Sequence, residues 1–214
     1  MASRLLRYVK AFLLEHITSV TGALRGVAFG GLATPDTNSI KLSIATAVTD
    51  SLYVTANFDG VNGGTLAAPG VNVSVTSGAS VGTYKTGASN PIIFTGLDAH
   101  TGETVSESLL LTAANGGETI VGKQLFAGAM VSISVPAQND ASGAFEFGTG
   151  ASVAIVPPAR GVYIGATGDL VAALVDDDAA SSVTYADMAE GITHPLWVRS
   201  IHESTTATSV VILR

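Results

Sequence analysis

The chain has 214 residues, of which 47% are hydrophobic and only 13% charged, and it contains no cysteine. This composition excludes a disordered chain, a disulfide framework, a cysteine-based zinc site and a thiol nucleophile. The net charge of −7 disfavours nucleic-acid binding, because lysine and arginine make the contacts to a phosphate backbone.

The first 20 residues predict one amphipathic helix. Apolar residues recur there at helical spacing, Ser3 is a suitable N-cap, and Thr21–Gly22 a suitable stop. Only four consecutive apolar residues, 11–14, lie between Lys10 and Glu15. A signal-peptide core needs roughly 7–15 apolar residues and a membrane helix about 18, so neither is expected.

We interpret residues 1–35 as a helical docking arm with a Gly-rich tether. Four basic residues and one acidic residue give this segment a charge of +3, whereas the rest of the chain carries −10. A helix lying on a membrane surface and a helix packed on its own domain are the alternatives. The candidate interface residues are Arg4, Leu5, Arg7, Val9, Lys10, Phe12, Leu13 and Ile17.

From Ile40 onward the apolar period changes from helical to two, which predicts strands separated by Gly, Pro and Asn turns. Eight strands with no helix between them predict an antiparallel β-sandwich or jelly-roll-like domain over residues 36–156. Turns are expected between them, for example at 59–64 and at 68–70. The expected strands are 41–48, 52–58, 71–76, 92–97, 104–111, 120–126, 130–135 and 144–148.

The Pro157–Pro158 pair is a natural hinge, and a second, small β domain is expected over residues 157–214. It contains the only tryptophan, Trp197, and its last strand is the C-terminus itself. The five expected strands are 160–165, 170–175, 182–187, 196–202 and 209–214.

Two short motifs resemble catalytic or nucleotide-binding signatures. Residues 117–123 fit G-x-x-x-x-G-K, but Gln124 replaces the Ser or Thr that binds magnesium, and the surrounding residues predict a strand. Residues 78–82 fit G-x-S-x-G around Ser80, but no helix is expected after Gly82, as a nucleophile elbow requires. We therefore expect no catalytic residue at either motif.

No metal or cofactor site is predicted. The four histidines lie at positions 16, 100, 194 and 202, without a second ligand at helical spacing. The acidic run 176–178 lacks the spacing of a calcium loop and is interpreted as a solvated hairpin tip. Asn72-Val-Ser74 is a glycosylation sequon only in a secretory context, which the N-terminus does not support.

The C-terminal quarter carries a consistent order of motifs. They are R-G-V-Y-I-G-x-x-G-D at 160–169, V-T-Y at 183–185, G-x-x-x-P-L-x-V-R at 191–199 and T-T-A-T-x-V-V at 205–211. In these motifs the segment resembles the head-spike base protein family of gene transfer agents and related tailed phages. The middle of the chain, from Phe94 to Val135 and again at 147–150, looks like a β domain that recurs in phage structural proteins, a looser match.

This resemblance implies a non-enzymatic structural protein of a virion, either a capsid decoration or a head-spike base. The implied partners are the major capsid protein or other virion proteins, and further copies of the chain in a trimer or pentamer. High apolar content beside low charge also favours self-association. No nucleic acid, membrane or cofactor is expected. The alternative is a tail-fibre-like or adhesin module that binds host-surface glycans.

Overall fold

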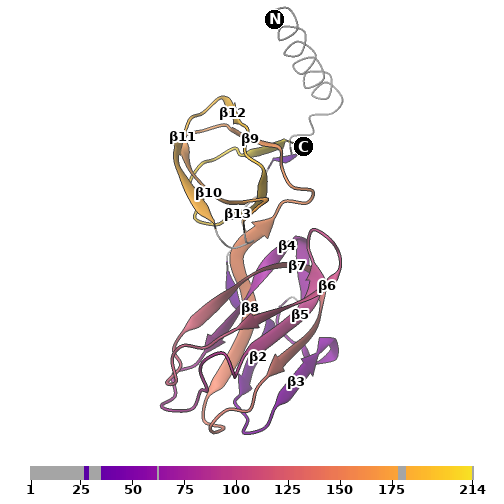
Figure 1. The fold of residues 1–214 in the computed structure, drawn as a ribbon, viewed down its shortest axis with the longest axis vertical. Coiled ribbons are helices and arrows are strands. Elements are labelled where there is room, and N and C mark those ends of the chain that lie inside the picture. Colours follow the sequence, from indigo (N-terminus) through magenta and orange to yellow (C-terminus); the bar gives the residue numbers. More distant parts are fainter. Residues whose placement is uncertain (1–26, 29–34, 62, 178–181, 214) are drawn as a thin grey trace, which may run out of the picture.

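The computed structural model describes residues 27–28, 35–61, 63–177 and 182–213. The described chain is mainly β, with an antiparallel sandwich-like sheet and a small second sheet, which confirms the predicted fold class. Figure 1 shows two lobes stacked along the long axis, with strand β8 running from the larger lobe toward the smaller one. The expected N-terminal helix lies outside the described residues.

The large lobe is built from seven antiparallel strands and the short 3-10 helix η1 (Thr55–Asn57). Five of the strands lie side by side in the order β8-β4-β7-β5-β6, while β2 pairs with β8 and β3 with β7. The strands are β2 (Asp36–Ala45), β3 (Ser51–Val54), β4 (Thr65–Ser77), β5 (Ile92–Asp98), β6 (Thr104–Leu109), β7 (Thr119–Val135) and β8 (Ala144–Ala154).

This sheet folds over on itself around one core. Ile40 of β2 and Leu109 of β6 come from strands far apart in the sheet order, yet both belong to the same cluster of buried side chains. The long strand β7 makes this possible, because its first part pairs with β4 and its last part with β5 and β3. The result is the predicted β-sandwich.

Aromatic rings fill the centre of the large lobe. Phe147 is fully buried and lies 5.7 Å from Phe94 and 6.1 Å from Phe145, measured between ring centroids. Tyr84 packs edge-on against Phe145, with 5.2 Å between the centroids. Each such buried ring contributes roughly 1.5–3 kcal/mol relative to an exposed one, so this cluster is a large part of what stabilises the lobe.

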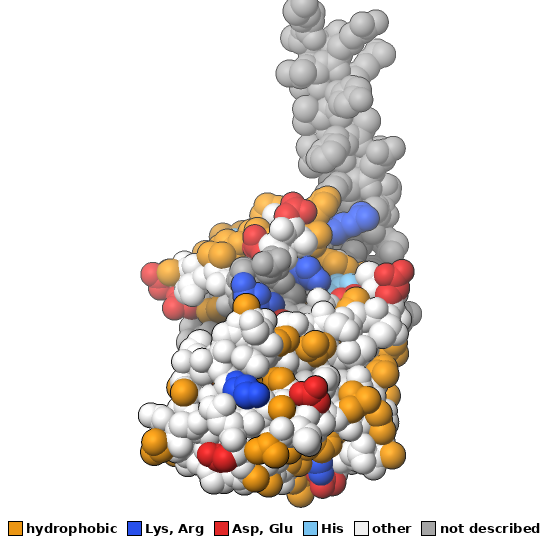
Figure 2. All heavy atoms as spheres, turned by 60° about the horizontal axis from the view of Figure 1, so that its bottom comes forward, with side chains coloured by type: hydrophobic (Ala, Val, Ile, Leu, Met, Phe, Trp, Pro, Cys, Tyr) orange, Lys and Arg blue, Asp and Glu red, His pale blue; other side chains and the backbone are white. Residues whose placement is uncertain are grey.

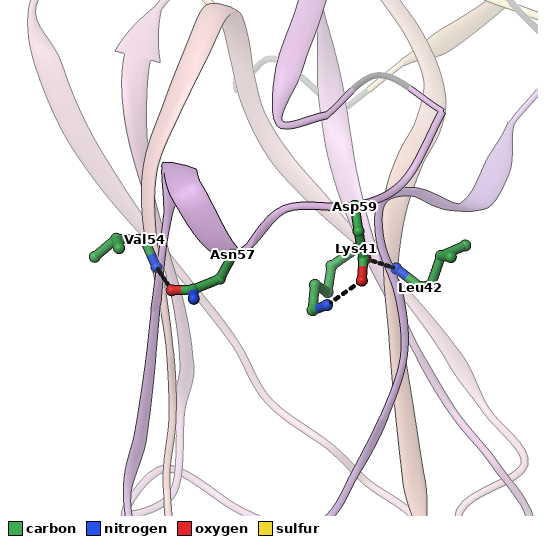
Figure 3. Close-up of polar contacts among 5 residues, drawn as sticks. All are labelled: Lys41, Leu42, Val54, Asn57 and Asp59. Carbon is green, nitrogen blue, oxygen red and sulfur yellow. Dashed lines mark hydrogen bonds and ion pairs between the residues drawn. The ribbon is translucent and has the colours of Figure 1, made fainter.

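A return segment after β3 closes one side of the large lobe (Figure 3). Asn57 accepts a hydrogen bond from the backbone N–H of Val54 at 2.9 Å, which ends the strand in a tight turn. Asp59 then accepts from the ammonium of Lys41 at 2.6 Å and from the backbone N–H of Leu42 at 3.0 Å. These contacts hold the segment beside β2 and lower the pKa of the Asp59 carboxyl, the Lys41 hydrogen bond being the larger cause.

The small lobe contains two sheets of short strands. One has the order β1-β14-β9-β12, and the other joins β11, β10 and β13 to β8 of the large lobe. The strands are β1 (Val27–Ala28), β9 (Gly161–Ile164), β10 (Gly168–Leu174), β11 (Val183–Met188), β12 (Ile192–His194), β13 (Val198–His202) and β14 (Val211–Leu213). Its separate core consists of Ile155, Ala159, Val162, Ile164, Leu170, Ala172, Met188, Val198, Ile201, Ala207, Val210 and Ile212.

Hydrogen-bonded strands connect the two lobes. Residues 200–202 of β13 pair with residues 152–154 at the end of β8. On either side of Pro157–Pro158, the backbone N–H groups of Ile155 and Ala159 donate to carbonyls of Arg199 and Val198, at 2.7 and 2.8 Å. The proline pair is therefore flanked on both sides by hydrogen bonds to β13.

Two expectations about elements were wrong in detail. The strands expected at 120–126 and 130–135 form the single strand β7. The turn expected at 68–70 lies inside β4, where the pairing with β7 is irregular between Leu66 and Val71. Such a bulge accommodates Pro69, which has no N–H to donate to a regular ladder. The strands β1 and β12 were not predicted.

Candidate functional site

The eight residues predicted to form the docking interface, Arg4 to Ile17, lie outside the described residues. The point where this segment joins the described structure is known. Val27 pairs with Ile212 of β14, in the small lobe. The N-terminal segment therefore leaves the described structure from the small lobe, through residues that were expected to belong to a loose tether.

The G-x-S-x-G motif forms a surface turn after β4. The hydroxyl of Ser80 lies 2.8 Å from that of Thr83 and 2.9 Å from that of Ser142. The Thr83 hydroxyl in turn donates to Asp140 at 3.0 Å, and hydrogen bonds from Ser142 lower the pKa of this carboxyl. Ser80 thus belongs to a hydroxyl network that ties loops together, and its turn leads into strand β5 rather than a helix.

The P-loop-like motif ends within strand β7, as its sequence context predicted. Gly122 lies against Glu107 of β6, and a Cβ at this position would come within 2.2 Å of the Glu107 carboxylate. Glu107 accepts the backbone N–H groups of Lys123 and Gln124, the latter at 3.1 Å. Burial raises the pKa of Glu107, although these two hydrogen bonds oppose the shift. Gly122 makes room for the Glu107 carboxylate, and the motif does not form a phosphate-binding loop.

The acidic run begins at the turn between β10 and β11, the predicted hairpin. Asp177 accepts from the backbone N–H of Leu174 at 3.1 Å, and Asp176 is exposed. Within residues 27–28, 35–61, 63–177 and 182–213, no three His, Cys, Asp or Glu side chains are grouped so that they could hold a metal ion.

Asn72 is buried and joins three strands. Its amide donates to the carbonyl of Gly122 on β7 at 2.9 Å and accepts from the N–H of Ser152 on β8 at 3.0 Å. Both neighbouring ladders are irregular at this point, so the side chain satisfies backbone groups that the ladders leave open. With 1% of its surface exposed, Asn72 is a structural residue rather than a glycosylation site.

A polar contact links the tip of the β5–β6 hairpin to the small lobe. The His100 imidazole Nε2 lies 3.2 Å from the backbone carbonyl of Arg199, a residue of β13. Burial, followed by the nearby Arg199 charge, lowers the pKa of His100. Its Nδ1 is buried without a hydrogen-bond partner among the described residues. Asp98 next to it has a lowered pKa, because N–H groups of Thr101 and His100 outweigh the opposing effect of its burial.

One surface of unusual composition on the large lobe is the outer side of β3, β7, β5 and β6. Cross-strand pairing puts Leu52, Ser134, Ile93 and Ser108 in one row, and Val54, Ser132, Thr95 and Ser106 in the next. Leu97 and Thr104 form a third row. None of these ten residues is charged and none is buried. We call this surface the uncharged face.

The uncharged face exposes aliphatic side chains between small hydroxyl groups. Leu52 is 64% exposed, Val54 43% and Leu97 36%. The hydroxyls of Thr95 and Ser106 form a cross-strand hydrogen bond of 2.8 Å. Figure 2 shows how thinly charged side chains are spread over the end of the large lobe that comes forward in that view. Such a surface favours contact with an uncharged partner surface.

A second candidate site is a groove on the small lobe, of about 540 Å³. Trp197 is 61% exposed at this groove, and Arg160 is also exposed. The backbone N–H of Arg160 donates to Leu213 of β14 at 2.9 Å, so the groove lies two strands away from β1. The lining residues are Pro157, Pro158, Ala159, Arg160, Val175 and Trp197.

Sequence reasoning did not identify either surface. The outward residues of each strand follow from the period of two, but their combination into one face depends on which strands are neighbours. Trp197 was expected inside a strand, whereas it lies just before β13 and points into a groove. Two features of the sequence could have indicated the groove. The only tryptophan lies two residues after Pro195, and Arg160 lies two residues after the proline pair.

In the part of the chain that the structure describes, no helix has the length and apolar character needed to cross a membrane. No family model matches the sequence, and no match was found among curated proteins or solved structures.

Proposed function

We propose that this chain is a non-enzymatic structural component of the virion of a tailed phage or gene-transfer-agent-like particle. In this role it acts as a capsid decoration or as the base of a head spike. Its partners are the major capsid protein or other virion proteins, together with further copies of itself.

The observation that carries this proposal is where the family-like motifs lie in the fold. They span residues 160–211, and the lobe formed by β9–β14 has its own core cluster. The resemblance therefore covers most of one packing unit, as expected when a module is shared between proteins. The two lobes share hydrogen-bonded strands, which suits a rigid spacer on a particle surface.

Attachment is assigned to the N-terminal segment. It carries +3 on a chain whose remainder is −10, and its apolar stripe needs a surface to cover it. Burying the stripe contributes several kcal/mol, at roughly 1.5–3 kcal/mol per large side chain before the cost of ordering the segment. Basic side chains opposite an acidic partner add mainly orientation and association rate.

The test is incorporation into particles. A tagged full-length chain is expressed in cells that produce the particles, which are then purified by density gradient and examined by mass spectrometry. We expect the full-length chain in the particle fraction, and a variant lacking residues 1–25 only in the soluble fraction. The proposal fails if the full-length chain never enters particles. If the truncated variant enters particles as well as the full-length chain, attachment belongs to another surface.

A second candidate function, binding of host-surface glycans, is favoured by the Trp197 groove. Its volume of about 540 Å³ suits a sugar, and an exposed indole beside a guanidinium offers both an apolar platform and hydrogen-bond donors. Trp197 is the only tryptophan, so its fluorescence reports binding directly. Titration with host-surface polysaccharides tests this function. A saturable change that the Arg160→Ala variant weakens supports it, and an unchanged spectrum contradicts it.

A further inference from the structure

We propose that two copies of this chain associate through the uncharged face, related by a two-fold axis that runs across the strands β3, β7, β5 and β6. This inference deepens the proposed function, on which it rests for the role of the contact. It names the surface and the symmetry with which the chain would meet a second copy in a virion.

Charge is the first reason to choose a second copy as the partner. Two copies each carry −7, so contacts through most of the surface bring like charges together. The ten residues of the uncharged face contribute no charge, and nothing there needs to be paired or desolvated at high cost. A strongly charged partner would gain no electrostatic attraction from this face. A second copy brings no charge of its own to the contact, so it meets no repulsion there.

The arrangement of the side chains is the second reason. The face consists of four columns, one per strand: aliphatic on β3, serine on β7, mostly aliphatic on β5 and hydroxyl on β6. A two-fold axis across the strands lays each strand over its own counterpart. Apolar columns then meet apolar columns, and hydroxyls meet hydroxyls. An axis along the strands would instead lay β3 over β6, and aliphatic side chains over hydroxyls.

Such a contact is isologous, because the same patch serves both partners. It joins copies in pairs, which differs from the trimer or pentamer expected from the sequence. The small serine side chains in the β7 column let the two sheets approach to the usual spacing of packed sheets, about 10 Å.

The size of the face sets the expected strength. Its ten positions, on strands about 4.8 Å apart and in rows about 6.8 Å apart, cover roughly 330 Å². A standard stable interface buries about 800 Å² on each partner. The isolated pair is therefore expected to be weak and to appear at high protein concentration, as on a particle surface where many copies are held close together.

The test compares two matched substitutions in the purified full-length chain. Thr95 lies in the middle row of the uncharged face and bonds to Ser106 across the strands. Thr119 makes the same kind of cross-strand bond elsewhere, since its exposed hydroxyl lies 2.9 Å from that of Thr76 on β4. Sedimentation velocity from micromolar to millimolar concentration measures self-association of the wild type, Thr95→Glu and Thr119→Glu.

We expect concentration-dependent dimers for the wild type. Thr95→Glu should weaken them by at least about tenfold, because carboxylates from both copies meet near the axis, while Thr119→Glu stays within about twofold. Ser106→Glu, on the exposed strand β6, repeats the test if Thr95→Glu fails to fold. A monomeric wild type throughout the range overturns the inference, as do equal effects of the two variants.

The outcome is independent of particle incorporation. A chain that forms pairs sensitive to Thr95→Glu but never enters particles keeps the inference about the face and loses the proposed function. The opposite outcome is a chain that stays monomeric in solution and enters particles equally well with and without Thr95→Glu. That outcome keeps the proposed function and overturns the inference about the face.

Discussion

The two lobes are stabilised by different kinds of side chain. The large lobe buries phenylalanine and tyrosine rings where its sheet folds over, and its longest strand has 17 residues. The core of the small lobe contains aliphatic residues, alanine and one methionine, and its longest strand has 7 residues. A lobe of short strands and small side chains buries less apolar area, so we infer that it depends on its pairing with β8.

The surfaces of the two lobes also differ, in shape and in residue type. The large lobe presents a broad uncharged face, suited to a flat partner. The small lobe presents a groove with an exposed tryptophan and arginine, and the N-terminal segment joins the structure at its sheet. This difference suggests a division of roles, with self-contact on the large lobe and attachment or recognition on the small one.

The largest expected effect is on the ring cluster of the large lobe. Phe147→Ala removes a ring that contacts Phe94 and Phe145, and should cost about 3–5 kcal/mol of unfolding free energy. Leu170→Ala, at a fully buried site of the small lobe, should cost less, toward the lower end of the roughly 2–5 kcal/mol range for buried leucines. Urea unfolding measures both. Equal losses would show that the rings are no more important than the aliphatic core.

Removing the side chain that joins three strands should follow. Asn72→Ala leaves the carbonyl of Gly122 and the N–H of Ser152 without their partner, at a cost of about 2–4 kcal/mol. Asn139→Ala is the matched control, because this exposed amide also donates to a backbone carbonyl, that of Gly82. Thermal melts should separate the two clearly. Equal stabilities of the two variants would refute the role given to Asn72.

A smaller effect is expected from pH at the contact between the lobes. The pKa of His100 is lowered in the folded chain, so between that value and 6.5 the unfolded chain binds the proton more readily. Its contribution to stability is present above pH 6.5 and is lost as the pH falls through the folded pKa. His100→Gln should lessen the fall in stability over this window, and His194→Gln should not. Identical pH profiles for all three proteins would contradict this.

The smallest expected effect is at the surface ion pair shown in Figure 3. Asp59→Asn removes the charge that attracts Lys41, but its amide oxygen still accepts from the backbone N–H of Leu42. We expect a loss below about 1 kcal/mol, as is usual for exposed pairs. Chemical denaturation at low and high salt measures it. A loss as large as that of Asn72→Ala would mean that the return segment is essential to the large lobe.

The period of two in the sequence predicted most of the strands, because many of them, such as β5 and β6, bury one face and leave the other partly exposed. Which strands pair with one another could be predicted less well from the sequence. The strand β1 has two residues and exists through its pairing with the C-terminal strand, and β12 has three residues paired with β9. Segments this short carry no readable period. Gly128, which adopts a left-handed conformation inside β7, resembles a turn signal in the sequence.

The candidate sites were predictable only in part. The sequence context correctly placed residues 117–123 at a strand and Ser80 in a turn. The uncharged face was not visible, since Leu52, Ser134 and Ile93 become neighbours only through the sheet order. The predicted interface residues between Arg4 and Ile17 stay a prediction, and their test is incorporation into particles.

The most direct test of the structural role is a reconstruction of purified particles at a resolution that distinguishes strands. Both lobes should fit density on the particle surface, with the small lobe and residues 1–25 toward the shell. Neighbouring large lobes should meet through the uncharged face. Well-resolved particles that are complete without density for either lobe would contradict the central claim.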